Sequence, residues 1–253
     1  MQTQEKSVTT AAIGASNVTK SYKVGDGSVE ILHGVSLEVE PGEMVAVMGA
    51  SGSGKSTLMY CLAGLEEPTT GSIDIGDQPL AGLSRAQLAE MRRSNVGFVF
   101  QSYNLIPTLT AYENAALPYT LGRKKAPKDL IDMTFDSLGL SERINAVPPS
   151  MSGGEQQRVA LARVLVQQPK VIFADEPTGA LDTRTGELVL EELVRIAHTP
   201  GHCVLVVTHD PKVAAAADRV LFMRDGLLVD ELVQGSVDQV AAALAALSTG
   251  DAL

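Results

Sequence analysis

The stretch Gly49-Ala50-Ser51-Gly52-Ser53-Gly54-Lys55-Ser56-Thr57 fits the pattern G-x-x-x-x-G-K-[ST] without a mismatch. The apolar run 44–48 precedes it, and a helical pattern over 57–63 follows it. A strand, a glycine loop and a helix in this order predict a nucleotide-binding loop, because inward-pointing backbone N–H groups and a helix N-terminus together cradle phosphate. Within this stretch, Lys55 is expected to reach the β- and γ-phosphates, and the Ser56 hydroxyl to ligate Mg²⁺.

A second candidate site follows the apolar strand pattern 171–174, which ends in Asp175 and Glu176. Carboxylates at the end of a strand beside a phosphate loop are expected to hold Mg²⁺ through water, here Asp175, and to polarise the attacking water, here Glu176. A strand that merely ends in two solvated acids is the alternative interpretation, and the intact phosphate loop disfavours it.

A third stretch, Ser152-Gly153-Gly154-Glu155-Gln156-Gln157-Arg158, has the Ser-x-x-Glu spacing of a helix capping box. Capping does not explain the two glycines between Ser152 and Glu155. A serine hydroxyl, glycine N–H groups and a helix N-terminus form a second anion site. Two phosphate-binding loops in one chain indicate composite sites, in which one subunit's loop meets the helix start of another subunit.

Composition limits the class of protein. The chain has 253 residues, 45% of them hydrophobic, and 20 basic against 30 acidic residues give a net charge of −10. This acidic balance argues against nucleic acid as the partner. No apolar run approaches the length of a membrane span, and the polar N-terminus is unlike a signal peptide. Cys61 and Cys203 lack metal-type spacing and are expected to fill core space. We expect a soluble cytoplasmic protein.

The order of segments predicts an α/β fold with a mostly parallel core sheet, an antiparallel β subdomain and an inserted helical subdomain. Residues 1–12 are expected to be a loose tail, 13–234 the nucleotide-binding domain, and 235–253 a C-terminal helix and tail. Strand patterns at 15–22, 29–32 and 35–39 make up the β subdomain, with a turn at Gly25-Asp26-Gly27. The helical subdomain is expected at about 88–165, with capping boxes at Ser84 and Thr110.

These motifs together resemble the ATP-binding subunit of an ABC transporter, over residues 13–232. Ser152 to Arg158 matches the ABC signature, although Met151 stands where the family usually has Leu. The resemblance implies further roles at matching positions. Tyr22 corresponds to the aromatic residue that stacks on adenine, and Gln101 to the glutamine that contacts Mg²⁺ and water. Gly179-Ala180-Leu181-Asp182 corresponds to the D-loop, and His209 to the switch histidine near the γ-phosphate.

A narrower resemblance rests on residues 104–114, on Ala116-Leu117-Pro118 and on the continuous run from Asp175 to Asp182. They are similar to the MacB/LolD/FtsE group, whose members pair with FtsX-like permeases in export, lipoprotein or peptide handling, or force transmission. Amino-acid importer subunits share much of this pattern and remain an alternative.

The resemblance implies an ATPase with ATP and Mg²⁺ as ligands. Glu176, His209, Gln101 and Lys55 are its expected catalytic residues. It also implies a homodimer that drives a membrane permease from the cytoplasmic face of the plasma membrane. A soluble ABC ATPase acting on DNA or ribosomes is the alternative from another class, and the acidic charge and the lack of coiled-coil insertions oppose it. A non-hydrolysing ATP binder is the third, and the intact carboxylates and His209 disfavour it.

Overall fold

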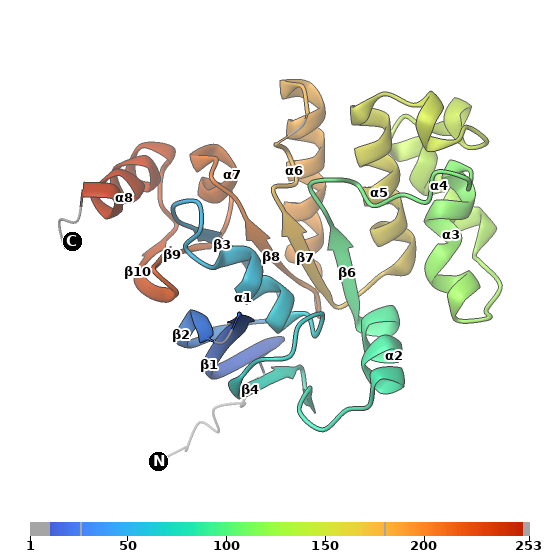
Figure 1. The fold of residues 1–253 in the computed structure, drawn as a ribbon. Helices are drawn as coiled ribbons and strands as arrows, with labels where there is room; N and C mark the ends of the chain where they lie inside the picture. Colours follow the sequence, from blue (N-terminus) through green and yellow to red (C-terminus); the bar gives the residue numbers. More distant parts are fainter. Residues whose placement is uncertain (1–10, 26, 180, 250–253) are drawn as a thin grey trace, which may run out of the picture.

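The computed structural model describes residues 11–25, 27–179 and 181–249 (Figure 1). Over these residues the chain forms two sheets. The strands of the larger sheet are β3 (Met44–Met48), β6 (Val96–Val99), β7 (Val171–Asp175), β8 (Cys203–Val207), β9 (Arg219–Arg224) and β10 (Leu227–Val233). Their order is β10-β9-β3-β8-β7-β6, and all neighbours pair in parallel except β10, which pairs antiparallel to β9. This mostly parallel sheet confirms the expected α/β class.

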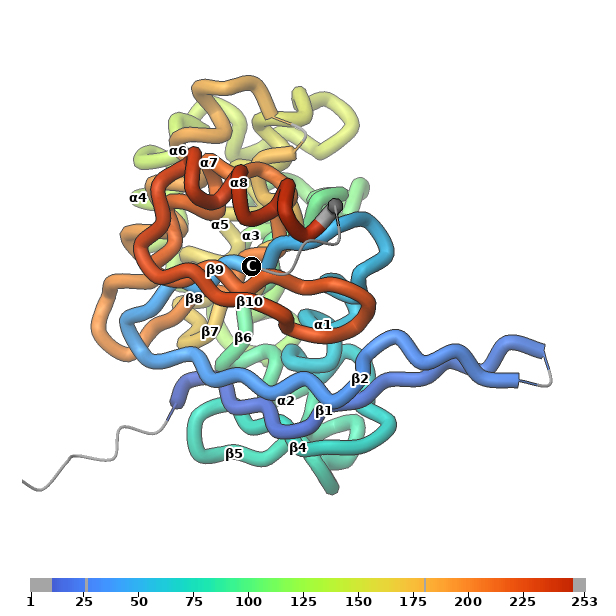
Figure 2. The backbone as a smooth tube through the Cα atoms, turned by 90° about the vertical axis from the view of Figure 1, so that its left-hand side faces the viewer, coloured from blue at the N-terminus to red at the C-terminus, as the bar shows by residue number. Residues whose placement is uncertain are grey.

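The smaller sheet is antiparallel and has the order β2-β1-β4-β5. Its strands are β1 (Ile13–Val24), β2 (Gly27–Val39), β4 (Thr70–Ile75) and β5 (Gln78–Pro79). The sequence predicted two separate strands at 29–32 and 35–39, but β2 runs through both. Gly34, which lies between them, belongs to the strand with a left-handed φ of 86°. The turn residue Asp26 lies outside the described residues. The far ends of β1 and β2 project beyond the body of the molecule as a hairpin (Figure 2).

The helices are α1 (Lys55–Leu62), α2 (Arg85–Asn95), α3 (Ala111–Leu121), α4 (Lys128–Ser137), α5 (Gly153–Gln167), α6 (Thr183–Ala197), α7 (Pro211–Ala215) and α8 (Val237–Thr249). Short 3₁₀ turns cover Ser141–Arg143 and Pro148–Ser150. The capping boxes predicted at Ser84, Thr110 and Ser152 are all formed, each closing with a Gln or Glu three residues later. These local motifs fix where α2, α3 and α5 begin.

Two apolar layers enclose the large sheet. Every residue of β3 is fully buried, with Val45 and Val47 on one face and Ala46 and Met48 on the other. The first face packs against α1 and the antiparallel sheet. The second packs against the helices of the later part of the chain, α5 among them. The strand that leads into the phosphate loop is therefore packed on both faces.

The domain ranges predicted from sequence differ from the structure at two places. β6 lies inside the range predicted for the helical subdomain, but it pairs with β7 at the edge of the large sheet. Ala12, predicted to belong to the tail, is 8% exposed, and its N–H donates to the Val39 carbonyl at 2.7 Å. The rest of that tail, residues 1–10, and residues 250–253 at the other end lie outside the described residues.

Both cysteines are buried and unpaired, as expected for core residues, and burial raises the pKa of the Cys203 thiol to about 12. Among the helices described, none is both long and apolar enough to cross a membrane.

Candidate functional site

The phosphate loop is a backbone cradle that only glycine fits at its ends. Gly49 has a φ of 157°, and a Cβ there would lie 2.1 Å from the Met223 carbonyl oxygen. Gly54 has a φ of 102° and caps the start of α1, with the Ile31 carbonyl 3.1 Å from the position of a Cβ. Both glycines therefore serve close backbone approach, which the sequence motif predicts. The buried Ser53 hydroxyl has no hydrogen-bond partner among the described residues.

Lys55 lies at the mouth of this cradle. Its ammonium group donates to the carbonyls of Gly49 at 2.9 Å and of Ala50 at 2.8 Å. Burial lowers the pKa of Lys55, while the charges of Glu176 and Asp175 oppose that shift. A cation held in this way over a ring of backbone N–H groups is suited to a polyphosphate, which would replace the two carbonyls as its partner.

The turn between β9 and β10 supports the loop from outside, which sequence analysis did not predict. The Gly226 N–H donates to the Ser53 carbonyl at 3.0 Å, and the Gly226 carbonyl accepts from the His33 N–H at 3.0 Å. A Cβ on Gly226 would lie 2.3 Å from the Ile31 carbonyl oxygen. The turn thus links the phosphate loop to β2 of the antiparallel sheet. Sequence motifs do not indicate these contacts, because the contacts join residues that are distant in the chain.

Asp175 and Glu176 follow one another at the carboxyl end of β7, next to the phosphate loop. Burial, and then the charge of Glu176, raise the pKa of Asp175, while Tyr60, Lys55 and Ser56 oppose that shift. The Tyr60 hydroxyl lies 3.4 Å from an Asp175 oxygen. The Ser56 hydroxyl and the Asp175 carboxylate are hard oxygen donors of the kind that Mg²⁺ prefers, so the residues present fit that ion.

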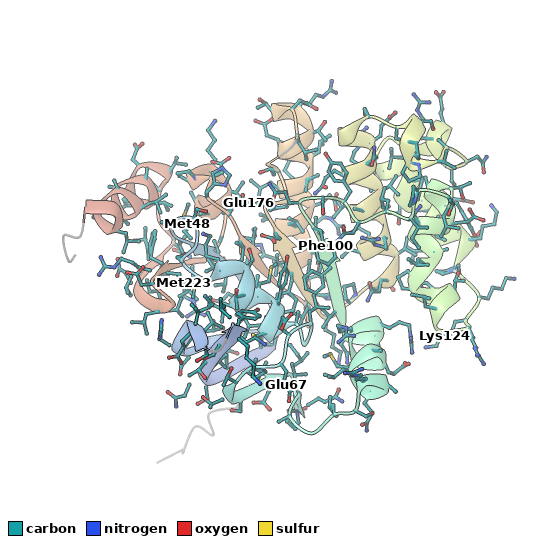
Figure 3. The ribbon with its side chains drawn as sticks, viewed as in Figure 1. Met48, Glu67, Phe100, Lys124, Glu176 and Met223 are labelled. Atoms are coloured by element: carbon teal, nitrogen blue, oxygen red, sulfur yellow. The ribbon has the colours of Figure 1, made fainter. Side chains whose placement is uncertain are left out.

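Glu176 is fixed by its backbone and by two side chains from the neighbouring strand end. Its φ is 46°, and its N–H donates to the Val207 carbonyl at 2.8 Å. His209 Nδ1 lies 2.7 Å from one carboxylate oxygen, and the Thr208 hydroxyl donates to the other at 3.3 Å. The carboxylate is largely buried, whereas His209 is largely exposed. The two residues predicted to act on water and γ-phosphate are therefore in direct contact (Figure 3 labels Glu176).

Gln101 lies beyond the end of β6 and is exposed. Its amide nitrogen is 3.9 Å from where a Cβ on Gly179 would lie, so it approaches the segment that follows Glu176. Next come Tyr103 and Asn104, which both adopt left-handed backbone angles, with φ of 60° and 48°. Strained non-glycine residues of this kind concentrate at functional sites.

This left-handed turn is fastened to α5, the helix that begins at Ser152. Arg163 of α5 donates to the Asn104 carbonyl at 2.9 Å and to the Tyr103 carbonyl at 3.3 Å. The Tyr103 hydroxyl lies 2.9 Å from the position that a Cβ on Gly153 would take. Gln101 and the start of α5 are therefore connected through one turn. Sequence analysis missed Arg163 and Tyr103, because neither residue belongs to a motif.

Ser152 caps α5, as predicted, and Glu155 closes the box at 2.8 Å from the Ser152 N–H. The backbone hydrogen bond from Ser152 lowers the pKa of Glu155, and Arg143 adds to this effect at 2.8 Å. The Glu155 carboxylate thus stabilises the start of α5. Among the hydrogen bonds of the described residues, none joins Ser152–Glu155 to the phosphate loop of the same chain.

Asp182 caps α6 by accepting from Thr185, with 2.7 Å between Asp182 Oδ2 and the Thr185 hydroxyl. Hydrogen bonds from the Thr185 side chain and backbone lower the pKa of Asp182. The same hydroxyl accepts from Arg158 of α5 at 3.4 Å. Of the predicted D-loop, Ala180 lies outside the described residues.

Tyr22 is the predicted site residue farthest from these contacts. It lies near the end of β1, paired with Val29 of β2, is 37% exposed, and its ring has the Lys20 ammonium 4.9 Å from the centroid. Among the described residues, no hydrogen bond or ring contact joins it to the phosphate loop. An exposed ring on this hairpin is free on one side to stack on a base.

The comparisons with known proteins decide the family. A family model described as ABC transporter matches residues 32–179, more than half of the chain. The chain belongs to the ABC transporter family. It is an ATP-binding, ATP-hydrolysing cassette.

Several relatives of this ABC ATPase are known. It is 46% identical over 215 residues to the uncharacterized ABC transporter ATP-binding protein YvrO of Bacillus subtilis (strain 168), covering 84% of this chain and 93% of that protein. It is 44% identical over 227 residues to the macrolide export ATP-binding/permease protein MacB of Brucella melitensis biotype 1, covering 87% of this chain. That match spans only 34% of MacB, so this chain corresponds to about a third of it.

Solved structures agree with this fold. The dimeric post-hydrolysis state of the ATP-binding cassette MJ0796, bound to ADP and Pi, matches with a TM-score of 0.83 at 38% identity, covering 88% of this chain and 99% of that one. A second dimeric structure of MJ0796, described as a bacterial ABC transporter cassette, matches with the same TM-score at 39% identity and with the same coverage.

Proposed function

We propose that two copies of this chain close around two ATP molecules and that this closure drives a permease of the FtsX/MacB type. One observation carries the dimer: two helix starts suited to an anion, at Lys55 and at Ser152, share no hydrogen bond among the described residues of one subunit. Each γ-phosphate would lie between Lys55 of one copy and Ser152 and Gly154 of the other. The dimeric state of the MJ0796 cassette supports this arrangement.

The chemistry follows from the contacts of Glu176. The carboxylate accepts a proton from water, whose oxygen then forms a bond to the γ-phosphorus while the bond from phosphorus to the ADP oxygen breaks. His209, hydrogen-bonded to the same carboxylate, orients Glu176 and faces the γ-phosphate from its exposed side. Lys55 stabilises the growing charge on the phosphate oxygens. Mg²⁺, held by Ser56 and, through water, by Asp175, with Gln101 beside it, would neutralise the β- and γ-phosphates.

The permease contact is proposed for a groove of about 350 Å³ beside the Gln101 turn. Its apolar lining includes Phe98, Phe100 and Leu117, and Arg163 and Asn104 belong to it as well. A short amphipathic helix of a membrane protein would suit such a groove. Because Arg163 also holds the turn after Gln101, a movement of that helix would reach both Gln101 and the start of α5. The cassette would then work at the cytoplasmic face of the membrane, in export, lipoprotein or peptide handling, or force transmission.

The decisive experiment uses the Glu176→Gln variant. Gln has nearly the shape of Glu but cannot accept a proton, so the variant should still bind ATP. Its turnover should fall at least about 100-fold, which is the typical effect of losing a general base. The variant should elute as a dimer in size-exclusion chromatography with ATP and Mg²⁺. Lys55→Ala is the matched control and should remain monomeric. Elution of Glu176→Gln as a monomer at saturating ATP would contradict the proposed sandwich.

A further inference from the structure

Positive charge is concentrated in one part of this acidic chain. Residues 85–128 contain Arg85, Arg92, Arg93, Arg123, Lys124, Lys125 and Lys128 against Glu90 and Glu113. This is seven basic against two acidic residues, a net charge of +5 in a chain whose total is −10. The remainder of the chain therefore carries −15. Such a separation indicates that this segment faces a negatively charged partner.

The fold brings two of these charges, Arg93 and Lys124, together on the surface. The end of α3 lies against α2: a Cβ on Gly122 would be 3.5 Å from Arg93 Cδ, and Arg93, Lys124 and Tyr119 line one small hollow of about 160 Å³. That hollow shares Arg93 with the groove proposed for the permease, so the two are continuous. Lys124 is far from Glu176 in Figure 3, and the surface is therefore separate from the nucleotide site.

Four of these seven cations, Arg85 and the three residues 123–125, make no ion pair or side-chain hydrogen bond within the described residues. Arg93 pairs with Glu90, Lys128 pairs with Asp132, and Arg92 donates to the Gly64 carbonyl at 2.6 Å. The side chains of Arg123, Lys124 and Lys125 are exposed and make no ion pair or side-chain hydrogen bond within the described residues. Leu121, 64% exposed, stands next to them at the end of α3. We call Leu121 and residues 123–125 the basic ridge.

We propose that the basic ridge binds the anionic phospholipid headgroups of the membrane that holds the permease. Three consecutive exposed cations, of which only Lys124 borders the small hollow and none has a carboxylate partner among the described residues, suit a diffuse negative surface better than one defined anion. The exposed leucine beside them suits the boundary between headgroups and acyl chains. This inference rests on the proposed function, because a permease in the adjoining groove would turn the ridge toward the membrane.

The expected strength is modest. Each Lys or Arg near an anionic membrane contributes roughly five-fold in partitioning, so the three ridge cations contribute roughly 100-fold together. Lipid contact would thus add to permease docking as a second, linked binding site. The rest of the chain is acidic and is repelled by anionic lipid, so net charge cannot cause binding.

The test is flotation of the purified chain with vesicles of phosphatidylcholine alone or mixed with phosphatidylglycerol. The wild type should float with the mixed vesicles at low salt, lose most binding at high salt, and ignore pure phosphatidylcholine. The triple variant Arg123→Gln, Lys124→Gln, Lys125→Gln should bind roughly 100-fold more weakly. The control triple Lys23→Gln, Lys170→Gln, Lys212→Gln has the same net charge and should float like the wild type.

ATP turnover of each variant in solution separates this inference from the proposed function. Both triple variants should hydrolyse ATP at the wild-type rate, because none of their residues touches the nucleotide site. If the wild type turns over ATP but does not float with anionic vesicles, the lipid assignment is wrong and an acidic protein segment becomes the occupant to seek. Equal loss of flotation in the two triple variants would also overturn the assignment.

Discussion

At the scale of single residues, the surroundings of Asp175 disfavour its ionised form. Burial and the neighbouring Glu176 raise its pKa above the ordinary value of 3.8. Folding therefore favours the protonated form, and the ionised carboxylate reduces stability at neutral pH. Such a cost is expected where a site awaits a cation, because Mg²⁺ would remove the repulsion between the two carboxylates.

We predict that Asp175→Asn raises the melting temperature of the nucleotide-free protein at neutral pH while reducing ATP turnover at least about 100-fold. The gain should be full well above the folded-state pKa of Asp175 and should be lost as pH falls through that pKa and then through the ordinary value of 3.8, because the folded wild-type carboxyl then takes up a proton. Thermal unfolding of both proteins across this pH range checks the sign. A gain that is constant with pH, or a loss at neutral pH, would refute the explanation from charge.

At the scale of elements, the strained turn Tyr103–Asn104 and helix α5 act as one unit. Left-handed angles cost non-glycine residues about 1–2 kcal/mol each, so the turn needs external support. Arg163 supplies it through two backbone carbonyls. Burial lowers the pKa of Arg163, and no carboxylate within the described residues pairs with it. The role that these contacts indicate for the Arg163 guanidinium group is to position the turn Tyr103–Asn104.

We predict that Arg163→Met lowers the free energy of unfolding by about 1–3 kcal/mol, because two hydrogen bonds to a charged donor are lost while the apolar stem is kept. In the Glu176→Gln background it should also weaken ATP-driven dimer formation, since the turn after Gln101 is no longer fixed to the helix that starts at Ser152. Arg195→Met, which loses only a surface pair with Glu192, should change neither. Normal dimer formation despite lower stability would make Arg163 a structural residue only.

The features of these elements that the sequence predicts are local ones. The capping boxes at Ser84, Thr110 and Ser152 and the phosphate loop each consist of residues within a few positions of one another, so their spacing alone predicts them. The placement of β6 in the large sheet, the contact of Gly226 with Ser53 and the hold of Arg163 on Asn104 join residues far apart in the chain. Propensity and periodicity are not informative about such pairs, because tertiary packing decides them.

The same limit applies to the site. The sequence predicted Glu176 and His209 separately, and the structure joins them at 2.7 Å. Tyr22 was predicted to stack on a base, and in the structure the Lys20 ammonium lies 4.9 Å from the centroid of its ring. A base-stacking role for it stays a prediction, because a stack is defined by a ligand and by the position of the hairpin relative to it.

At the scale of the whole molecule, the phosphate loop and the Ser152 helix start share no hydrogen bond among the described residues of one copy. If each active site joins Lys55 of one subunit to Ser152 of the other, two inactive variants should restore each other. The Lys55→Ala variant keeps an intact Ser152 helix start, and the Ser152→Arg variant keeps an intact phosphate loop. A mixed dimer therefore contains one intact site. Because Lys55→Ala does not pair with itself, the mixture should hydrolyse ATP faster than the two variants measured separately, and at most at about half the wild-type rate, since each mixed dimer has one intact site of two.

Steady-state ATP hydrolysis of the separate and mixed variants measures this restoration. Loss of a helix cap by itself costs about 1 kcal/mol, and Ser84→Arg, which breaks the capping box of α2, is the matched control for that effect. Ser84→Arg should stay active without a partner variant. Ser152→Arg alone should still bind ATP, because its own phosphate loop is unchanged. A mixture no more active than its two separate components would mean that Ser152 serves its own chain, and the two-subunit site would have to be abandoned.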